Sequence, residues 1–416
     1  MEELLFLAHR IPFPPRKGDK IRSHHVLSLL ADRYRIHLGT FVDEPADWPH
    51  VDHVKRLCDE TYFARLNRRW AAARSLAGLF RGQPLTLPYL RDRGLARWVA
   101  DVLARRPVRA AFIFSSGMGQ YVERMPNLRR VVDFVDVDSD KWRQYALSCK
   151  GARRRLFERE AEHLLAYERL LARSCDAVFF VSPAEAGLFR SLAPEVAAKI
   201  RYFNNGVDVV FFSPEHTCAS PYPAGQLPIV FTGAMDYWPN VDAVDWFARA
   251  IFPTVKGVVP NAGFWIVGSN PAAGVRRLAC LPGVHITGTV PDVRPFLRHA
   301  RVAVAPMRVA RGVQNKVLEA MAMGKATVVS PQALEGIDAT AGRDLLLAST
   351  AQGFAEAIVQ LLQQPRRDLE AAARTLVVQR YQWTQNLQRV LDALASPPPA
   401  AGPDDAPLRE TPPLAA

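Results

Sequence analysis

The stretch of the chain from residue 301 to residue 330 constrains its fold more than any other. Two apolar runs, at 301–305 and 327–330, have the length and the β-branched content of buried strands. Between them lies a segment with helical periodicity that begins near Asn315. A strand, a helix and a second strand in this order predict a βαβ unit with parallel strands.

The polar residues of this unit indicate a ligand site at the start of its helix. A loop with Gly312 precedes the helix, Asn315 and Lys316 open it, and Glu319 follows one turn later. The free N–H groups of a helix N-terminus favour anions, and a lysine ammonium adds positive charge. Because Ala320 and the residues after it are small or apolar, Glu319 is expected to be buried and to hydrogen-bond a ligand. As alternatives, Glu319 is a solvated surface residue, and Asn315 and Lys316 serve only as capping and solvated residues.

The length of 416 residues and the 49% hydrophobic content suit two α/β domains better than one. The two domains are expected at 1–205 and 206–375. The Pro- and Ala-rich residues 396–416 cannot form a core and should be disordered.

Apolar runs alternate with helical segments in both halves, which predicts doubly wound parallel sheets. The predicted strands are short, mostly apolar runs at 4–8, 36–41, 110–114, 131–135, 177–181, 229–232, 263–267, 285–287, 302–305 and 327–330. Helices are expected near 24–31, 152–173, 241–251, 315–323 and 354–362, with further helical structure in the arginine-rich region 65–106.

Several protein classes do not fit the composition. No uninterrupted run of about 18 apolar residues occurs, so a membrane-spanning helix is not expected. Residues 1–8 have the pattern of a first buried strand, not of a signal peptide, which predicts a cytoplasmic protein. The five cysteines are scattered and form no CxxC pair, so neither a disulfide framework nor a zinc site is expected.

The positive charge is concentrated in the first half of the chain. Residues 1–200 hold 34 Lys and Arg against 24 Asp and Glu, a net +10, which leaves +2 of the total +12 for residues 201–416. Ten arginines but only two carboxylates fall within 65–106, interleaved with tryptophans and leucines. This pattern predicts docking on an anionic membrane surface; the alternative is a solvated face over a core stripe. No nucleic-acid recognition motif accompanies the charge, so nucleic acid is not an expected partner.

Glycines follow four of the predicted strands in the second half, as Gly233, Gly268, Gly288 and Gly312, and the third of these loops continues to Val290. In open α/β sheets, ligands bind at the carboxyl ends of the strands. One glycine alone indicates only a turn. Four such loops along one edge allow the backbone to approach a nucleotide closely.

Much of the chain resembles retaining glycosyltransferases of family 4, and in particular the sugar transferases of bacterial exopolysaccharide and exosortase (PEP-CTERM) loci. The segments that carry the likeness are 18–22, 133–136, 231–237 and 311–316, within a match that extends from residue 3 to residue 390. The resemblance implies the GT-B fold, in which two Rossmann-like domains face a central cleft. The segment 199–214 resembles the interdomain segment of these enzymes, so the hinge is expected there. The resemblance also implies that 376–395 form a last helix that crosses back onto the N-terminal domain.

The resemblance implies the reaction as well. A sugar would pass from a UDP- or GDP-linked donor to a growing, lipid-linked glycan, with retention at the anomeric carbon and without a metal or another cofactor. Such an enzyme would work in the cytoplasm, peripherally at the inner face of the cell membrane. Glu319 would hold the nucleotide ribose, and Lys316 and Arg311 would stabilise the departing diphosphate.

In family 4 enzymes the loop after the first strand helps to seat the donor phosphates and the acceptor. Gly18, Lys20 and Arg22 stand there in this chain and suit that work, with a purely structural turn as the alternative. Asp136 and Asp138 follow a later strand. Alternate strand residues point to opposite faces, and the family is metal-independent, so we predict acceptor-side roles for these two carboxylates instead of a metal site.

The chain departs from the wider family at two positions. The family signature has two glutamates eight residues apart, and here Arg311 stands in the place of the first while Glu319 supplies the second. The family's cleft histidine after the fourth strand is also absent, and Ser115 occupies that region of the acceptor side. Contacts with the donor sugar at these positions therefore cannot be transferred from the family.

Three other functions compete with the transferase. A GT-B nucleotide-sugar epimerase would need acid and base side chains that the sequence does not show. A non-catalytic, membrane-associated assembly protein of the polysaccharide machinery is compatible with Arg311 and Ser115. A dinucleotide oxidoreductase fits less well, because the strand-to-helix turns lack G-x-G-x-x-G.

Overall fold

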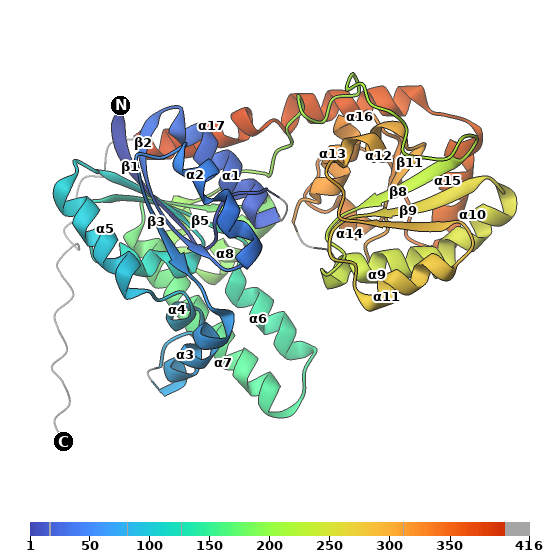
Figure 1. Ribbon diagram of the computed structural model, residues 1–416. Coiled ribbons are helices and arrows are strands. Elements are labelled where there is room, and N and C mark those ends of the chain that lie inside the picture. Colours follow the sequence, from blue (N-terminus) through green and yellow to red (C-terminus); the bar gives the residue numbers. More distant parts are fainter. Residues whose placement is uncertain (16–17, 81, 126, 311, 396–416) are drawn as a thin grey trace.

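The computed structural model describes residues 1–15, 18–80, 82–125, 127–310 and 312–395. Within these residues the chain forms two parallel sheets with helices packed around each (Figure 1). This confirms the predicted pair of Rossmann-like domains. Arg311 and the tail at 396–416 lie outside the described residues.

The first sheet has seven parallel strands in the order β3-β2-β1-β4-β5-β6-β7. The strands are β1 (Glu2–Ala8), β2 (Tyr34–Val42), β3 (Glu60–Arg65), β4 (Ala110–Phe114), β5 (Arg129–Val135), β6 (Ala177–Phe180) and β7 (Ile200–Tyr202). The α-helices are α1 (Gly18–Ala31), α2 (Val51–Lys55), α3 (Arg68–Phe80), α4 (Thr86–Tyr89), α5 (Arg93–Arg105), α6 (Asp138–Leu147), α7 (Gly151–Ser174) and α8 (Pro183–Leu192). Leu5 and Leu7 of β1 belong to one hydrophobic cluster and Leu4 and Phe6 to another, so helices cover both faces of the sheet.

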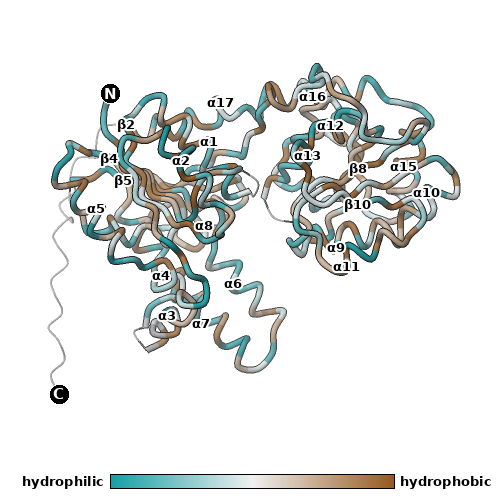
Figure 2. Tube along the Cα trace, viewed as in Figure 1, coloured by the Kyte–Doolittle hydropathy of each residue, from teal (hydrophilic) through white to brown (hydrophobic). Residues whose placement is uncertain are grey.

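The second sheet has six parallel strands in the order β10-β9-β8-β11-β12-β13. The strands are β8 (Leu227–Thr232), β9 (Ala262–Val267), β10 (Val284–Gly288), β11 (Val302–Ala305), β12 (Thr327–Val329) and β13 (Leu346–Leu347). Its α-helices are α9 (Trp238–Trp246), α10 (Phe252–Val258), α11 (Ala273–Arg277), α12 (Arg294–His299), α13 (Asn315–Ala322), α14 (Pro331–Leu334), α15 (Ala351–Gln363) and α16 (Arg367–Arg380). Hydrophobic residues concentrate in the strands of both sheets (Figure 2).

The final helix, α17 (Trp383–Ala395), leaves the second domain and packs on the first (Figure 1). Leu387 and Leu391 of this helix join the cluster that contains Leu4 and Phe6. The guanidinium of Arg129 on β5 donates a hydrogen bond to the carbonyl of Ala393, 2.8 Å away. The two domains are therefore joined twice, by the segment 203–226 between the sheets and by the step from α16 to α17.

Candidate functional site

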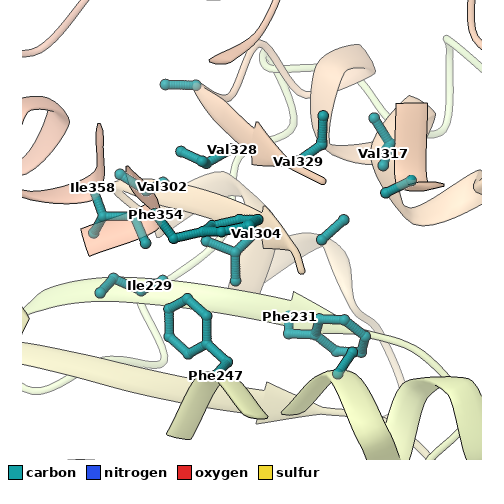
Figure 3. Packing of buried hydrophobic residues seen from close by; sticks show 14 of the residues in the cluster. Ile229, Phe231, Phe247, Val302, Val304, Val317, Val328, Val329, Phe354 and Ile358 are labelled. Carbon is teal, nitrogen blue, oxygen red and sulfur yellow. The ribbon is translucent and has the colours of Figure 1, made fainter. Parts of the chain in front are cut away.

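Helix α13 fixes the predicted anion site at the carboxyl edge of the second sheet. Val317 of α13 packs in the core with Val304 of β11 and Val329 of β12, which holds the start of the helix against the sheet (Figure 3). Lys316, the residue before it, is half-buried and lies with its ammonium 3.2 Å from the amide oxygen of Gln314 and 5.4 Å from the Phe231 ring centre. The anchored helix therefore holds one ammonium group at its own N-terminus.

The pKa values of Lys316 and Glu319 are both shifted toward neutral pH. Burial lowers the pKa of Lys316 to about 8, although Glu319 acts in the opposite direction. Burial also raises the pKa of Glu319 to about 7, against the effect of Lys316. An anion bound beside Lys316 would favour the charged ammonium. The charge of this pair can therefore change when a ligand binds.

The glycine loops after β8 and β9 touch each other beside α13. A Cβ atom at Gly268 would lie 1.6 Å from the carbonyl oxygen of Gly233, and a Cβ at Gly233 would lie 3.5 Å from Cε of Lys316. The N–H of Gly233 also donates to the carbonyl of Val267, 3.1 Å away. Glycine is needed at Gly268 because no side chain fits between the two loops.

The third predicted loop begins at Gly288, the last residue of β10, whose φ of 69° lies in the left-handed region. Val290, two residues later, packs against the cluster that contains Val267 and Leu297. The loops that follow β8, β9, β10 and β11 thus all begin at the carboxyl edge of the same parallel sheet, as the sequence predicted. Backbone atoms of these loops line that edge.

Replacing Gly268 by alanine should destabilise the second domain. The new methyl group would overlap the carbonyl of Gly233, so the loops must separate, at a cost of about 1–3 kcal/mol in the free energy of unfolding. Gly257→Ala is the matched control, since no atom lies within 4 Å of its Cβ position and alanine is the better helix former at that place in α10. Urea unfolding of both variants measures the difference, and equal midpoints would contradict the contact.

Asn240 belongs to this site, although the sequence analysis did not single it out. It is buried in α9, and its amide nitrogen donates to the carbonyl of Ala234, 2.9 Å away. Its side-chain oxygen is buried and has no hydrogen-bond partner among the described residues. The same side chain lies 2.7 Å from the Cβ position of Gly233. A buried amide oxygen without a partner beside a glycine loop indicates a place for a donor group of a ligand.

The loop with Gly312 reaches the N-terminal domain. A Cβ at Gly312 would lie 3.4 Å from Cγ1 of Val181 and 3.9 Å from a carboxylate oxygen of Asp136. Asp136 and Asp138 both accept hydrogen bonds from the ammonium of Lys141, at 2.7 and 3.0 Å. The two carboxylates are therefore neighbours across the domain junction from the predicted donor loop.

The structure corrects the local interpretation of these carboxylates. Strand β5 ends at Val135 and Asp138 is the first residue of α6, so the alternation of a strand does not separate Asp136 from Asp138. Burial lowers the pKa of Lys141, but Asp138 and Asp136 outweigh it, and the pKa is raised. The three side chains form one hydrogen-bonded cluster, in which the ammonium of Lys141 stays charged at neutral pH.

Lys20 and Arg22 do not lie where a phosphate could reach them, in contrast to their predicted role. The Lys20 ammonium is buried 2.5 Å from Asp47. Arg22 is 0% exposed, and its guanidinium donates to both carboxylate oxygens of Asp133, at 2.7 and 3.1 Å. Both charges are neutralised inside the domain. Gly18, by contrast, is exposed at the first residue of α1.

Arg22 instead connects the N-terminal domain to the start of α13. Its guanidinium donates to the side-chain oxygen of Asn205, 3.0 Å away, and the amide nitrogen of Asn205 donates to the side-chain oxygen of Asn315 at 3.3 Å. Asn315 precedes Lys316. This chain of hydrogen bonds fixes the predicted anion site relative to the first sheet.

Two residues with unusual backbone conformations lie at the carboxyl ends of neighbouring strands of the first sheet. Ser115 follows β4 with a φ of 81°, and Val135 ends β5 with a φ of 71°. Positive φ is rare for a β-branched residue and costs about 1–3 kcal/mol. Such strain is concentrated at functional sites. Ser115, which the sequence analysis predicted for the acceptor side, is therefore itself strained, and Asp136 directly follows the strained Val135.

Part of the second domain matches a known protein family. Residues 226–364, which span β8 to α15, match the protein family described as Glycosyl transferases group 1. No curated protein matches the chain.

The whole chain is similar in fold to solved glycosyltransferase structures of the GT-B class. Sucrose-phosphate synthase from Thermosynechococcus elongatus is 17% identical with a TM-score of 0.68, and the match covers 94% of this chain and 98% of that one. HepE from Anabaena, in complex with UDP and glucose, is 14% identical with a TM-score of 0.67 over 95% and 100% of the two chains. WaaG, a glycosyltransferase involved in lipopolysaccharide biosynthesis, is 14% identical with a TM-score of 0.64 over 95% and 100%. The chain therefore has the GT-B fold, and its residues 226–364 match the family described as Glycosyl transferases group 1.

Proposed function

We propose that this chain transfers a sugar from a UDP- or GDP-linked donor to a growing, lipid-linked glycan during synthesis of a surface exopolysaccharide. The observation that carries the proposal is the position of Lys316 at the start of α13, beside the touching glycine loops and inside the group 1 domain. A cation, free helix N–H groups and open backbone together suit a nucleoside diphosphate. The similar HepE structure holds UDP and glucose.

In the proposed reaction, the bond between the anomeric carbon and the diphosphate oxygen breaks. The acceptor hydroxyl oxygen bonds to that carbon on the same face, and its proton passes to the departing phosphate. Lys316 and the N–H groups of α13 stabilise the negative charge that develops on the diphosphate. Glu319 accepts hydrogen bonds from the ribose. No covalent nucleophile and no metal is required in this scheme.

The proposed acceptor side comprises Asp136, Asp138 and Ser115, with Gly18 at the start of α1. Asp136 supports this assignment because it lies next to the loop of Gly312, where a donor sugar would project. Arg311, the proposed diphosphate clamp, belongs to the same loop and lies outside the described residues. A lipid-linked acceptor would bring this side of the protein to an anionic membrane surface.

A transfer assay tests the proposal. The purified chain is incubated with a panel of UDP- and GDP-sugars and a membrane lipid extract, and both nucleoside diphosphate release and new glycolipid are measured. We expect both products with one donor, with the anomeric configuration retained. Donor binding without either product would contradict a transferase and favour the non-catalytic assembly protein, whereas a changed donor sugar would indicate an epimerase.

Replacing Glu319 by alanine should weaken nucleotide binding without lowering stability. Loss of hydrogen bonds to the ribose would reduce affinity by about tenfold, since a bond to a charged group contributes roughly 1.5–3 kcal/mol. Burial raises the pKa of Glu319, so folding disfavours its charged form, and loss of the carboxylate should leave the melting temperature nearly unchanged. Calorimetry and thermal melting of the same sample separate the two effects. A lower melting temperature with unchanged affinity would assign Glu319 a structural role.

Nucleotide binding should weaken as the pH rises through about 8. The lowered pKa of Lys316 means that the free protein loses this charge near pH 8, while a bound diphosphate favours the ammonium form. Affinity should fall by up to about tenfold for each pH unit above that value. Calorimetry between pH 7 and 10 measures the slope, and Lys316→Met should remove it. A flat profile for the unaltered protein would show that the ammonium does not meet the diphosphate.

A further inference from the structure

Part of the N-terminal domain projects away from both sheets (Figure 1). We call it the arm and define it as residues 68–90 and 138–160 apart from residue 81; it comprises α3, α4, α6 and the first part of α7. The carboxylate of Glu160 accepts hydrogen bonds from the N–H groups of Leu85 and Thr86, at 2.6 and 3.2 Å. Arg159 donates to the carbonyl of Gly78, 3.3 Å away. The two halves of the arm are thus joined into one unit.

Large apolar side chains of the arm face solvent. Trp70 and Leu76 on α3 are 75% and 53% exposed, and Ala73 lies between them on the same helix face. In the last turn of α6, Tyr145 and Leu147 are 51% and 74% exposed. Single exposed apolar residues need no explanation, but a group on one projecting element marks an interaction surface.

The arm also carries positive charge without matching carboxylates. The sequence has no Asp or Glu between residues 61 and 91, and none between 141 and 157. Lys150, Arg153 and Arg155 are exposed and make no ion pair with the described part of the chain, and Arg69 is exposed on α3. The arm therefore carries exposed cations as well as exposed apolar groups, and Lys150 follows Leu147 by only three residues.

The structure favours a different part of the N-terminal domain as the membrane surface than the sequence did. The region 65–106 was expected to dock as a whole, but Arg105 on α5 pairs with Asp101 and Glu60, and Arg106 pairs with Glu60. Arg74 donates to the backbone carbonyls of Pro88 and Tyr89. The end of α5 and Arg74 of α3 are thus occupied by internal contacts. Cations outside the ion pairs of the described residues are Lys150 and, in the first turns of α7, Arg153 and Arg155, all outside 65–106.

We infer that the arm docks on an anionic lipid bilayer, with Trp70, Leu76 and Leu147 at the headgroup level and the cations on lipid phosphates. An element that combines exposed tryptophan and leucine with Lys and Arg outside ion pairs has the composition that binds such a surface. No helix among the described residues is long and apolar enough to cross a membrane, so the contact is peripheral. The inference rests on the proposed function, because a lipid-linked acceptor requires the protein to work at a bilayer.

Vesicle sedimentation tests the inference with matched variants. The unaltered chain should sediment with vesicles of phosphatidylcholine and phosphatidylglycerol but not with phosphatidylcholine alone. The triple variant K150S/R153S/R155S should bind about 100-fold more weakly, from three lost contacts with the anionic surface. R276S/R277S/R301S removes the same charge from exposed sites of the second domain and should bind normally.

A second pair of variants tests the apolar part. W70S/L147S should weaken binding by at least about tenfold, whereas W48S/V258S, which alters exposed side chains outside the arm, should not. Equal sedimentation of the arm variants and their controls would overturn the inference, as would binding to neutral vesicles alone or to none.

Calorimetry with UDP and GDP on the same samples separates this inference from the proposed function. Arm variants that bind nucleotide normally but not vesicles would support both. Vesicle binding through the arm without nucleotide binding would overturn the proposed function alone. Nucleotide binding without vesicle binding by the unaltered chain would overturn only the inference that the arm docks on a bilayer.

Discussion

Replacing Arg22 by alanine should lower the free energy of unfolding of the N-terminal domain by about 3–5 kcal/mol, the largest stability effect that we expect for a single site. The substitution would leave the fully buried carboxylate of Asp133 without its cation. It would also remove hydrogen bonds to Asn205 and to the carbonyl of Phe203. Urea unfolding measures the change.

Arg35→Ala is the matched control for this experiment. Arg35 also pairs with an aspartate, Asp59, at 3.2 Å, but it is half exposed on β2. Its loss should cost less than about 1 kcal/mol, because exposed ion pairs contribute little. Replacing both Arg22 and Asp133 by apolar residues should be milder than Arg22→Ala, since no unpaired charge remains. Equal losses for Arg22→Ala and Arg35→Ala would contradict a buried pair.

Replacing Lys316 by methionine should reduce the rate of transfer by about 100- to 1000-fold, the effect of removing one donor that stabilises a developing negative charge. It should also weaken nucleotide binding, because the diphosphate loses a charged partner. Methionine keeps the apolar stem of the side chain and removes only the ammonium. The stem lies near Gly233 and the Phe231 ring, so the packing of the site should survive. Calorimetry and the transfer assay measure the two losses.

Lys325→Met is the control for Lys316. Burial lowers the pKa of Lys325 to about 8 as well, although Glu370 opposes the shift. Lys325 lies beyond the opposite end of α13, so it cannot share a ligand with the helix N-terminus. Nucleotide binding should be unchanged by its loss. If both variants lost affinity equally, the general charge of the domain and not the position of Lys316 would bind the nucleotide.

The two-domain fold could be predicted because its cause is visible in the sequence. Strands buried on both faces appear as continuous apolar runs, and helices separate them. Strand β3 (Glu60–Arg65) escaped prediction because it lies at the sheet edge and contains polar residues. Helix α6 escaped because its first turn is rich in aspartate, which suggested a strand end with a loop.

The parts of the candidate site that glycine loops and a helix N-terminus form could be predicted from the sequence. The parts that residues far apart in the sequence form could not. Glycine loops and Lys316 follow from local order along the chain. The partners of Arg22 lie on β5 and in the interdomain segment, 111 and 183 residues away, so no spacing rule indicates them. The conformation of Val135 could not be predicted either, because valine rarely adopts a left-handed conformation.

A crystal structure of the chain with bound UDP or GDP would test the central claim most directly. We predict the terminal phosphate within hydrogen-bond distance of the Lys316 ammonium and of the first N–H groups of α13, with the ribose hydroxyls on Glu319. A diphosphate bound elsewhere, with Lys316 still on Gln314, would contradict the assignment of this helix start as the donor site.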